Sequence, residues 1–260
     1  MPSAITRAAL APVLAGPSVR TEQVTQLALG ETAAILEQNG DWCRVSTYAD
    51  GYSGWVHRGY VLEAEDSAAE EWRGRAIGWS EGAMLRLGHL HLPVPMRARL
   101  MVRGTVVVLP DGQQARIESG SVPELDEVRR TARAKAPERW AVEHFSGTPY
   151  QWGGVTPWGV DCSGLVQTTF AARGVSLPRD SSQQVACGAE VDLAAIQPGD
   201  LLFFRGESSQ ITHVAFAGEA DTLVHATLAC GGMLVESWLP GTRAAALRER
   251  LVAVRRLEPR

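Results

Sequence analysis

The chain has 260 residues, of which 45% are hydrophobic and 21% charged, and its net charge is −4. These values are ordinary for a soluble globular protein with two or three domains. The negative charge argues against a nucleic-acid-binding protein, because phosphate recognition depends on clustered Lys and Arg. The one basic run, residues 129–139, holds five Arg or Lys and is better explained as the solvated face of a helix.

The sequence carries no strong targeting signal. No apolar run approaches the ~18 residues that span a bilayer, so we expect no membrane insertion. The apolar stretch 8–16 is broken by Pro12 and preceded by a single Arg7, which makes a poor secretory signal. We therefore expect this stretch to form the first strand of a folded domain, and we expect a cytoplasmic protein, with export to the cell envelope as the alternative.

The first 66 residues contain short runs of alternating polarity separated by turn residues. Strands are predicted at residues 33–36, 42–47 and 52–57, with hairpin signals NGD at 39–41 and DG at 50–51. Pairs of short strands at this spacing predict a small β-barrel.

A second set of such runs follows Trp72. Strands are predicted at residues 76–79, 83–87, 99–102, 105–109 and 114–118, with a PDG turn at 110–112. This set predicts another barrel of similar size.

The remaining sequence mixes helical and strand patterns. Residues 123–146 have helical composition interrupted at Pro137, which predicts a linker at 123–136 and a helix at 138–145. Residues 162–173 predict a second helix, with Gly174 as its stop signal. Strands are then predicted at residues 201–205, 211–217, 222–226, 233–238 and 251–257. A helix followed by an antiparallel run of strands indicates an α+β domain.

The stretch YQWGGVTPWGVDCSGL, residues 150–165, surrounds one cysteine with glycines and aromatic residues. If Cys162 begins a helix, the helix dipole favours its thiolate and lowers its pKa. Asp161 is a good N-cap, and the glycines allow a sharp turn and close approach of a substrate. A cysteine nucleophile also needs a base within hydrogen-bond reach and a third group to orient that base.

Two of the six histidines can supply these groups. His213 lies in ITHVAF and His225 in TLVHAT, on two predicted strands joined by the turn GEAD. An antiparallel hairpin can bring residues twelve apart onto one face. Taken singly, each of these residues is more often an inert core thiol or a satisfied core histidine. Together with Cys162 they favour a catalytic site.

Several segments, in this order, resemble the catalytic domain of the NlpC family of papain-like cysteine peptidases: DCSGLVQ at 161–167, PRDSSQQ at 178–184, QPGDLLFF at 197–204 and THVAF at 212–216. The resemblance covers about residues 137–257 and includes the later His225. It implies that Cys162 is the nucleophile, that His213 is the general base and acid, and that His225 orients His213. Tyr150 matches the position whose hydroxyl forms an oxyanion hole with the Cys162 backbone N–H.

The resemblance implies no cofactor. The pair His89 and His91 lacks a third ligand nearby, so no metal site is expected.

Residues 24–56 resemble bacterial SH3-like domains, and residues of about 70–122 match that pattern more loosely. The expected fold is therefore multidomain: two small all-β SH3-like barrels followed by an α+β papain-like cysteine peptidase domain. The expected boundaries are residues 1–66 and 67–122 for the barrels, 123–136 for a linker and 137–260 for the peptidase.

This domain combination is similar to enzymes that cut the γ-D-glutamyl bond to a diamino acid and release L-Ala-γ-D-Glu from muropeptides. Those enzymes require a free N-terminal L-alanine, and a cationic amine calls for a pocket that presents carboxylates. The resemblance implies the following substrate-binding residues: Asp180 as the amine-binding acid, Ser181 and Ser163 beside it, Tyr52 as an aromatic wall, Glu22 as a candidate second acid, and Trp152 in the same subsite. The alternatives are a turn-capping role for Asp180, barrel packing for Tyr52 and a solvated position for Glu22.

The expected partner is thus a muropeptide, with no nucleic acid and no membrane. One alternative is a broader murein endopeptidase or amidase that acts on intact cell wall. Others are a catalytically silent wall-binding protein and a transferase in which an amine captures the thioester. The sequence leaves open the oligomeric state, the choice between meso-diaminopimelate and lysine, and the choice between peptide and polymer.

Overall fold

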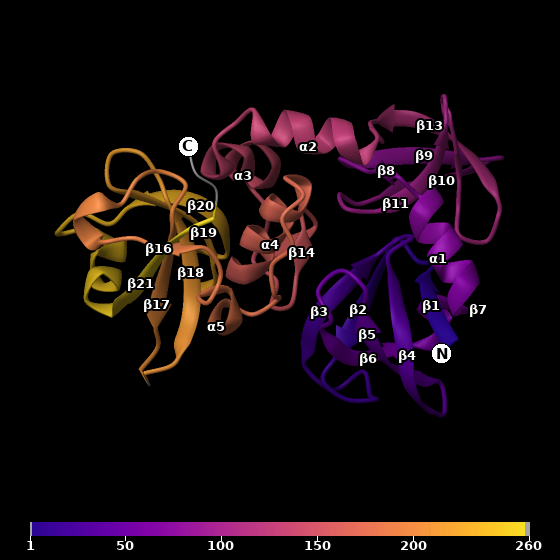
Figure 1. Cartoon of the computed structure of the whole chain (residues 1–260), viewed down its shortest axis with the longest axis horizontal. Helices are drawn as coiled ribbons and strands as arrows, with labels where there is room; N and C mark the ends of the chain where they lie inside the picture. Colours follow the sequence, from indigo (N-terminus) through magenta and orange to yellow (C-terminus); the bar gives the residue numbers. More distant parts are fainter. Residues whose placement is uncertain (1, 208, 258–260) are drawn as a thin grey trace. The chain divides into compact units, whose positions relative to one another are not determined.

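The computed structural model describes residues 2–207 and 209–257. The chain forms two compact units, Met1–Val128 and Arg129–Arg260. The division between them falls inside residues 123–136, the segment that the sequence predicts as a linker. A helix, α2 (Leu125–Arg133), runs through this point (Figure 1).

The first unit begins with a seven-stranded antiparallel sheet in the order β3-β2-β6-β5-β4-β1-β7. Its strands are β1 (Pro2–Thr6), β2 (Leu10–Leu14), β3 (Gln23–Ala28), β4 (Thr32–Asn39), β5 (Trp42–Thr47), β6 (Ser53–His57) and β7 (Val61–Glu65), with a short 3-10 turn η1 (Arg58–Tyr60) between the last two. The prediction that the apolar stretch 8–16 is the first strand is wrong, because β1 precedes it. Pro12 fits in β2 because β2 pairs with β6 only through Leu14 and Trp55, which leaves that edge open at the proline.

The core of this sheet follows the two-residue period of its strands. In β5, Cys43 and Val45 point inward and are buried, while Arg44 between them is exposed. The buried residues that pack together are Ala4, Ala11, Val13, Leu27, Ala33, Ile35, Cys43, Val45, Val56 and Val61. Cys43 is therefore a core residue.

A second, six-stranded sheet in the first unit has the order β10-β9-β13-β12-β11-β8. Its strands are β8 (Gly78–Trp79), β9 (Ala83–Leu87), β10 (Leu90–Val94), β11 (Arg99–Arg103), β12 (Val106–Val108) and β13 (Gln114–Gly120). Among the described residues each of the two sheets ends in two edge strands, so neither ladder closes on itself. The assignment of the second sheet as an SH3-like barrel stays a prediction.

Helix α1 (Asp66–Arg75) joins the two sheets and was not predicted from the sequence. Its Trp72 is buried and donates its Nε1–H to the Gly30 carbonyl oxygen at 2.8 Å. A buried ion pair between Arg97 and Glu31, 2.9 Å between Nη2 and Oε1, adds a second link between the sheets. These contacts explain why the two sheets form one compact unit.

The second unit is built on a six-stranded antiparallel sheet in the order β16-β21-β17-β18-β19-β20. Its strands are β16 (Ala189–Glu190), β17 (Leu201–Arg205), β18 (Ile211–Ala217), β19 (Thr222–Thr227), β20 (Gly232–Ser237) and β21 (Leu251–Arg256), and β14 (Val155–Thr156) pairs separately with β15 (Gly159–Val160). The helices are α3 (Pro137–Phe145), α4 (Cys162–Ala172) and α5 (Ser181–Gln184), with 3-10 segments η2 (Leu193–Ala195), η3 (Leu228–Cys230) and η4 (Arg243–Arg250). The predicted strands 201–205 and 211–217 match β17 and β18 in full.

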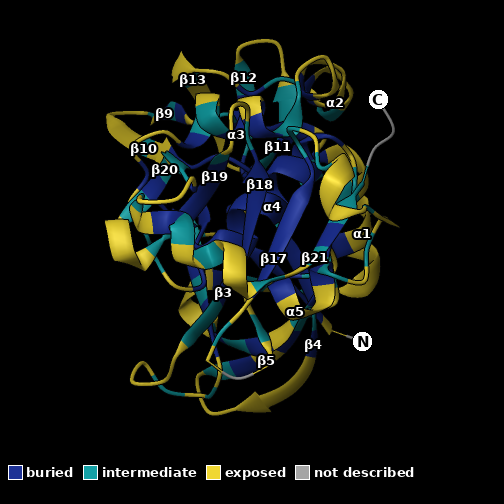
Figure 2. Ribbon diagram, turned by 90° about the vertical axis from the view of Figure 1, so that its left-hand side faces the viewer, coloured by how far each residue is buried: buried dark blue, intermediate teal, exposed yellow. Residues whose placement is uncertain are grey.

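This sheet is covered on both faces. Helix α4 packs on one face, where Phe170 lies against Phe216 with ring centroids 6.0 Å apart (Figure 1). The other face packs on η4 through Phe204, Trp238 and Ala244. Because α4 is also enclosed by the segments around it, nearly every one of its residues is buried (Figure 2). Burial on all sides accounts for its apolar composition.

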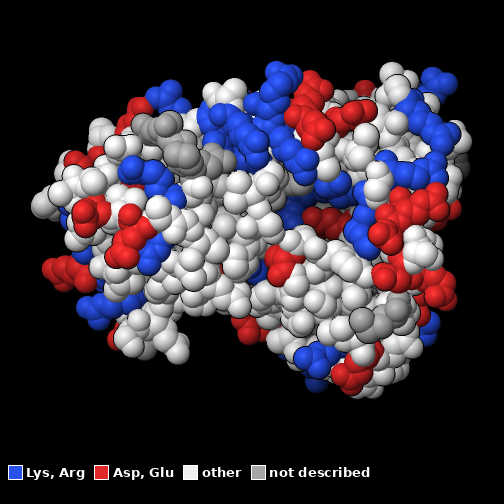
Figure 3. Space-filling model, viewed as in Figure 1, with Lys and Arg blue, Asp and Glu red and all other residues white. Residues whose placement is uncertain are grey.

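The five basic residues of the run 129–139 all have exposed side chains, and they gather over α2 and α3 in Figure 3. This is the solvated helix face that the sequence predicts. Among the described residues, no helix has the length and apolar character needed to cross a bilayer.

Candidate active site

Helix α4 begins at Cys162, and the Asp161 carboxylate organises its first turn. One carboxylate oxygen, Oδ1, accepts the Gly164 N–H at 2.7 Å. The other, Oδ2, accepts the Gly153 N–H at 2.8 Å and so fixes the incoming loop. Asp161 is therefore the N-cap that the sequence predicts, and it also ties the glycine-rich approach to the helix.

A buried arginine completes this cap. The Arg179 guanidinium donates to both oxygens of Asp161, with Nη1–Oδ1 at 3.0 Å and Nη2–Oδ2 at 2.5 Å. Its Nη1 also donates to the Ser163 hydroxyl at 2.7 Å. Sequence reasoning assigned no role to Arg179, although its place between Pro178 and Asp180 in the resembling motif was visible. Fork-to-fork pairing of this kind holds a carboxylate in a fixed orientation.

Steric crowding explains why glycines surround Cys162. A Cβ on Gly164 would lie 2.1 Å from the Gly154 carbonyl oxygen, and one on Gly154 would lie 2.3 Å from that of Gly159. Gly153 has φ +74°, a conformation that favours glycine. Helix α4 can therefore pack against the loop only because these positions have no side chains.

The Cys162 thiol is buried, with 7% of the residue exposed. Burial raises the pKa of the thiol to about 12, and the Asp161 carboxylate adds to this, while N–H groups of Val214 and Ser163 that donate to the sulfur act in the opposite direction. The expectation that the helix start lowers this pKa is therefore wrong for the substrate-free site. Desolvation of the thiolate outweighs the donors at the helix start.

The two strand histidines come together. His213 Nε2 and His225 Nδ1 lie 2.7 Å apart, joined by a hydrogen bond between β18 and β19. The Val214 backbone N–H, which donates to the Cys162 sulfur, directly follows His213 in β18, so the backbone of the histidine strand lies against Cys162. A contact between the His213 ring and the thiol stays a prediction. Burial lowers the pKa of His213 to about 3, with His225 and Arg243 contributing in the same direction. Thiol and imidazole are thus both neutral near pH 7.

A carboxylate extends the histidine pair. His225 Nε2 lies 2.8 Å from Glu236 Oε1 on β20, and both oxygens of Glu236 accept hydrogen bonds from Arg243. Sequence reasoning did not select Glu236. The signal was present as one acid in the apolar strand MLVES, two residues after Leu234, which pairs directly with His225. Residues two apart in a strand share a face, so Glu236 is a diagonal neighbour of His225.

Tyr150 is fixed at the same end of the sheet. Its backbone N–H donates to the Gly231 carbonyl oxygen at 2.8 Å. Burial raises the pKa of the Tyr150 hydroxyl, and the nearby Cys162 and Asp161 charges raise it further. The hydroxyl thus stays protonated as a donor and stands within electrostatic range of the sulfur. Its place in an oxyanion hole stays a prediction.

The segment 178–184 lies against the start of α4. Gln184 Nε2 donates to the Ser163 carbonyl oxygen at 3.1 Å and to that of Pro178 at 2.9 Å. Asp180 occupies the N-cap position of α5, and its side chain makes no capping hydrogen bond there. Ser181 is buried, and the Ser163 hydroxyl is engaged by Arg179 and Asp161. Capping is therefore no explanation for the Asp180 carboxylate.

The other predicted substrate-binding residues lie in two places. Trp152 belongs to the loop before Cys162, and the residue is 57% exposed. Tyr52 and Glu22 belong to the first unit, where Tyr52 is half-buried beside β6 and Glu22 is exposed before β3. Their roles toward a substrate stay predictions.

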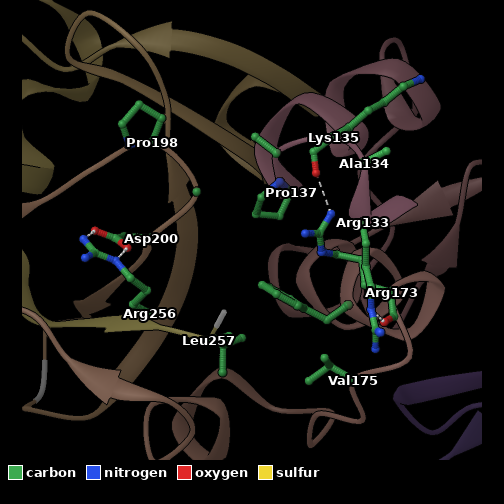
Figure 4. Close-up of a pocket in the computed structure, with 13 residues that line it drawn as sticks. Arg133, Ala134, Lys135, Pro137, Arg173, Val175, Pro198, Asp200, Arg256 and Leu257 are labelled. Carbon is green, nitrogen blue, oxygen red and sulfur yellow. Dashed lines mark hydrogen bonds and ion pairs between the residues drawn. The ribbon is translucent and has the colours of Figure 1, made fainter. Parts of the chain in front are cut away.

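A pocket of about 640 Å³ lies elsewhere in the second unit (Figure 4). Its lining includes Arg133, Lys135, Arg173 and Asp200, and contains neither Cys162 nor a histidine. Arg173 donates to the Lys135 carbonyl oxygen at 2.7 Å, and Arg256 Nε donates to Asp200 at 2.7 Å. Arg173 thus ties the end of α4 to the connection between α2 and α3, and Arg256 ties β21 to the residue before β17, so we assign the pocket a structural origin.

His91 lies in β10, and His89 directly precedes that strand. The His91 ring contacts Glu118, with 2.7 Å between Nδ1 and Oε2. Within the described parts of the chain, no group of three His, Cys, Asp or Glu side chains is arranged to hold a metal ion.

Comparison with known proteins places these features in a family. Residues 147–245 match the NlpC/P60 family, and residues 9–61 match the bacterial SH3 domain. The solved structure of an NlpC/P60 family protein from Bacillus cereus superposes with a TM-score of 0.78 at 21% identity, covering 99% of this chain and 100% of that one. At that identity the superposition shows a shared fold.

Three relatives illustrate the range of similarity. A γ-D-glutamyl-L-lysine dipeptidyl-peptidase of Bacillus cereus is 26% identical over 77% of this chain and 66% of its own length. A dipeptidyl-peptidase 6 of Lysinibacillus sphaericus is 28% identical over 87% of this chain and 88% of its own length. The probable endopeptidase NlpC of Escherichia coli is 39% identical over 35% of this chain and 61% of its own length.

The chain covers less than two thirds of the length of the first and third of these relatives. The match to the Escherichia coli protein extends over 94 residues, whereas the two dipeptidyl-peptidases align over most of the chain. The chain therefore contains a domain of the NlpC/P60 family of peptidoglycan cysteine peptidases, whose homologues include dipeptidyl-peptidases and endopeptidases, together with a bacterial SH3 domain.

Proposed function

We propose that the protein hydrolyses the γ-D-glutamyl–diamino acid bond of muropeptides with a free N-terminal L-Ala and releases L-Ala-γ-D-Glu for recycling. The observation that carries this proposal is the hydrogen-bonded pair His213–His225, whose strand β18 donates the Val214 N–H to the Cys162 sulfur at the start of a buried helix. It is supported by relatives named dipeptidyl-peptidases, whose similarity extends over most of the chain.

In the first step Cys162 attacks the γ-carbonyl carbon of D-Glu. Because thiol and imidazole are both neutral in the substrate-free site, the thiol proton passes to His213 as the S–C bond forms. His213 Nε2 is hydrogen-bonded to His225 Nδ1, so the other ring nitrogen of His213, Nδ1, takes this proton. The tetrahedral oxyanion is held by the Tyr150 hydroxyl and the Cys162 backbone N–H.

In the second step His213 returns the proton to the departing amine of the diamino acid. The C–N bond breaks and leaves a thioester between Cys162 and the L-Ala-γ-D-Glu moiety. His213 then takes a proton from water as the water oxygen attacks the thioester. Collapse of that intermediate releases the dipeptide and restores the thiol, with no cofactor involved.

The amine of L-Ala is bound by carboxylates in this proposal. Asp180 and Ser181 lie in the segment that Gln184 ties to the start of α4, so they are near the nucleophile's helix. Ser163 contributes by holding Arg179 in place, and Trp152 forms a wall of the subsite. We further propose that Tyr52 serves as an aromatic wall and Glu22 as an additional acid toward the substrate.

The same proposal covers the accessory part of the chain. We propose that the second sheet, β8 to β13, is also an SH3-like barrel, so that two such barrels precede the peptidase domain. We further propose a cytoplasmic enzyme acting on free muropeptides, which agrees with a recycling role.

One alternative has an observation in its favour. The probable endopeptidase NlpC of Escherichia coli is 39% identical over 94 residues, whereas the Bacillus cereus dipeptidyl-peptidase is 26% identical over 77% of the chain. A broader endopeptidase acting on cell-wall polymer would use the same Cys162 and histidine pair. It would not require a free amine on the substrate.

The dipeptidyl-peptidase and the endopeptidase are distinguished by whether cleavage requires a free N-terminal amine on the substrate. The full-length protein is incubated with L-Ala-γ-D-Glu-meso-diaminopimelate, with its L-lysine counterpart and with the N-acetylated form of each, and products are followed by mass spectrometry. Cys162→Ala is the inactive variant. Cys187→Ala, which removes a half-buried cysteine outside the site, is the matched control.

Cleavage of the free-amine peptides alone, lost in Cys162→Ala and kept in Cys187→Ala, is the expected result. Equal cleavage of acetylated peptides would replace the dipeptidyl-peptidase proposal with the endopeptidase. Absence of cleavage in all four would overturn both and favour acyl transfer or a binding role.

A further inference from the structure

A buried chain of hydrogen-bonding groups runs from His213 to the edge of the domain. His213 bonds to His225 at 2.7 Å, His225 bonds to Glu236 at 2.8 Å, and Arg243 donates to both oxygens of Glu236. The His225 side chain is 1% exposed and that of Glu236 14% exposed. Three strands and η4 thus contribute one group each to a continuous series.

The series has only one consistent arrangement of protons at neutral pH. Glu236, paired with Arg243, is a carboxylate that can only accept hydrogen bonds, so His225 must carry its proton on Nε2. Burial keeps His225 neutral by lowering its pKa. Its Nδ1 is then an acceptor, and the hydrogen bond to His213 requires the proton of His213 on Nε2. That leaves the His213 Nδ1 lone pair for the thiol.

We propose that Glu236, held in place by Arg243, is a positioning residue that sets the tautomer of both histidines and thereby presents a proton-accepting Nδ1 on His213 to Cys162. This inference rests on the proposed catalytic roles of Cys162 and His213. It adds two side chains to the site that neither the sequence motifs nor the histidine pair identifies.

Arg243 has a separate part in the arrangement. Its Nε donates to Glu236 Oε2 at 3.1 Å, and its Nη2 donates to Oε1. Two donors aimed at two oxygens fix the plane of the carboxylate, so that Oε1 points at the His225 ring. Arg243 itself is about half exposed, so its role is to orient the carboxylate.

The electrostatic surroundings of His225 agree with this assignment. The charged or titratable groups that act on it are Glu236 from β20, Arg243 from η4 and His213 from β18. Glu236 favours a protonated His225, whereas burial and Arg243 oppose it. Glu236 can therefore direct the proton to Nε2 without making His225 a permanent cation.

The first experiment reads the tautomers directly and needs no substrate. Long-range ¹H–¹⁵N correlation spectra of the full-length ¹⁵N-labelled protein distinguish protonated from unprotonated ring nitrogens, with His213→Gln and His225→Gln assigning the signals. We expect protonated Nε2 and unprotonated Nδ1 on both rings. In Glu236→Ala, His225 loses its carboxylate acceptor, and we expect a mixture of tautomers on both rings.

The second experiment measures kcat and KM of the same variants on the peptide that the protein cleaves. Loss of a group that orients a catalytic histidine should lower kcat by about 10- to 100-fold with little change in KM. Glu219→Ala is the matched control, because it removes a Glu paired with an arginine, Arg139, in the same unit without touching a histidine. Glu236→Gln keeps an acceptor oxygen of the same reach and should fall between the wild type and Glu236→Ala.

Wild-type tautomers as expected, a mixed state in Glu236→Ala and an unchanged Glu219→Ala would support the proposal. A protonated His225 Nδ1 in the wild type would overturn it, as would a Glu236→Ala protein whose tautomers and kcat match those of Glu219→Ala. If Glu236→Ala does not fold, Glu236→Gln and Arg243→Ala replace it in both measurements, and wild-type values in both would overturn the proposal. If no muropeptide is cleaved, the spectra still decide this inference while the proposed function fails.

Discussion

The Arg179 guanidinium donates to both carboxylate oxygens of Asp161, at 3.0 Å and 2.5 Å, in a buried ion pair next to Cys162. This ion pair links the segment that follows α4 to Asp161, the N-cap of that helix. Asp161 also accepts two backbone N–H groups, so its charge is fully partnered. One carboxylate thus anchors the loop, the helix start and the following segment.

Removal of this arginine should leave Asp161 as an uncompensated buried charge. We expect Arg179→Met to lower the free energy of unfolding by about 3–5 kcal/mol, as breaking one side of a buried pair does. Arg139→Met, which breaks a solvent-exposed pair with Glu219, should leave the free energy of unfolding almost unchanged. Urea denaturation measures the free energy of unfolding of both variants. Similar small decreases in the two would contradict the anchoring role of Arg179.

The glycine contact at the helix start can be tested by adding one methyl group. In Gly164→Ala the new Cβ would meet the Gly154 carbonyl oxygen at 2.1 Å. We expect a loss of stability of roughly 1–3 kcal/mol and a lower kcat, because either the loop or the helix must shift. Gly74→Ala in α1 meets nothing within 4 Å and should instead stabilise by up to about 1 kcal/mol. Thermal unfolding and kinetics of the two variants make the comparison; equal effects would rule out the close approach.

The pH dependence of kcat/KM should reflect ionisation of the substrate's amine more than ionisation of Cys162 or His213. Because burial raises the pKa of Cys162 to about 12 and lowers that of His213 to about 3, both groups stay neutral over the pH range in which kinetics can be measured. Kinetics between about pH 5 and pH 9 should therefore show no acid limb. A decline above about pH 8 is expected, because the substrate's α-amine then loses the proton that its carboxylate pocket recognises. A clear acid limb near about pH 6–7 would show an imidazole that titrates freely, in conflict with the buried site.

The same burial should make stability depend on pH. The pKa of His213 falls from 6.5 to about 3 on folding, so between these values the unfolded chain binds a proton that the folded one does not. Stability is then fully present above about pH 6.5 and declines as the pH falls, by on the order of 2 kcal/mol at pH 5 from this group. His213→Gln should remove that part of the decline. Thermal unfolding from pH 5 to pH 8 measures it, and parallel curves for both proteins would contradict the shift.

The sequence determined much of the second unit directly. The segment that follows Asp161 is a helix because an N-cap residue and an apolar stripe leave few other options, and β17 and β18 match their predicted bounds because a turn and an apolar run delimit each. In the first unit, β5 and β9 were predicted in full by the same two-residue period. Helix α1 was missed because its pattern is weak, and only Trp72 and Ala69 are buried by tertiary packing.

The sequence alone also identified the candidate reactive groups, because it shows a cysteine after an N-cap residue and two histidines on adjoining predicted strands. It could not settle their protonation. The thiol pKa is raised because the folded chain removes water from Cys162, an effect that depends on all the elements around it.

Arg179, Glu236 and Arg243 likewise acquire their partners only through the fold. Arg179 meets Asp161 across eighteen positions and Glu236 meets His225 across eleven. Sequence spacing fixes which residues share a face within one element. Strand order, register and burial fix which faces meet, and through them which charges are paired and which nitrogen carries a proton.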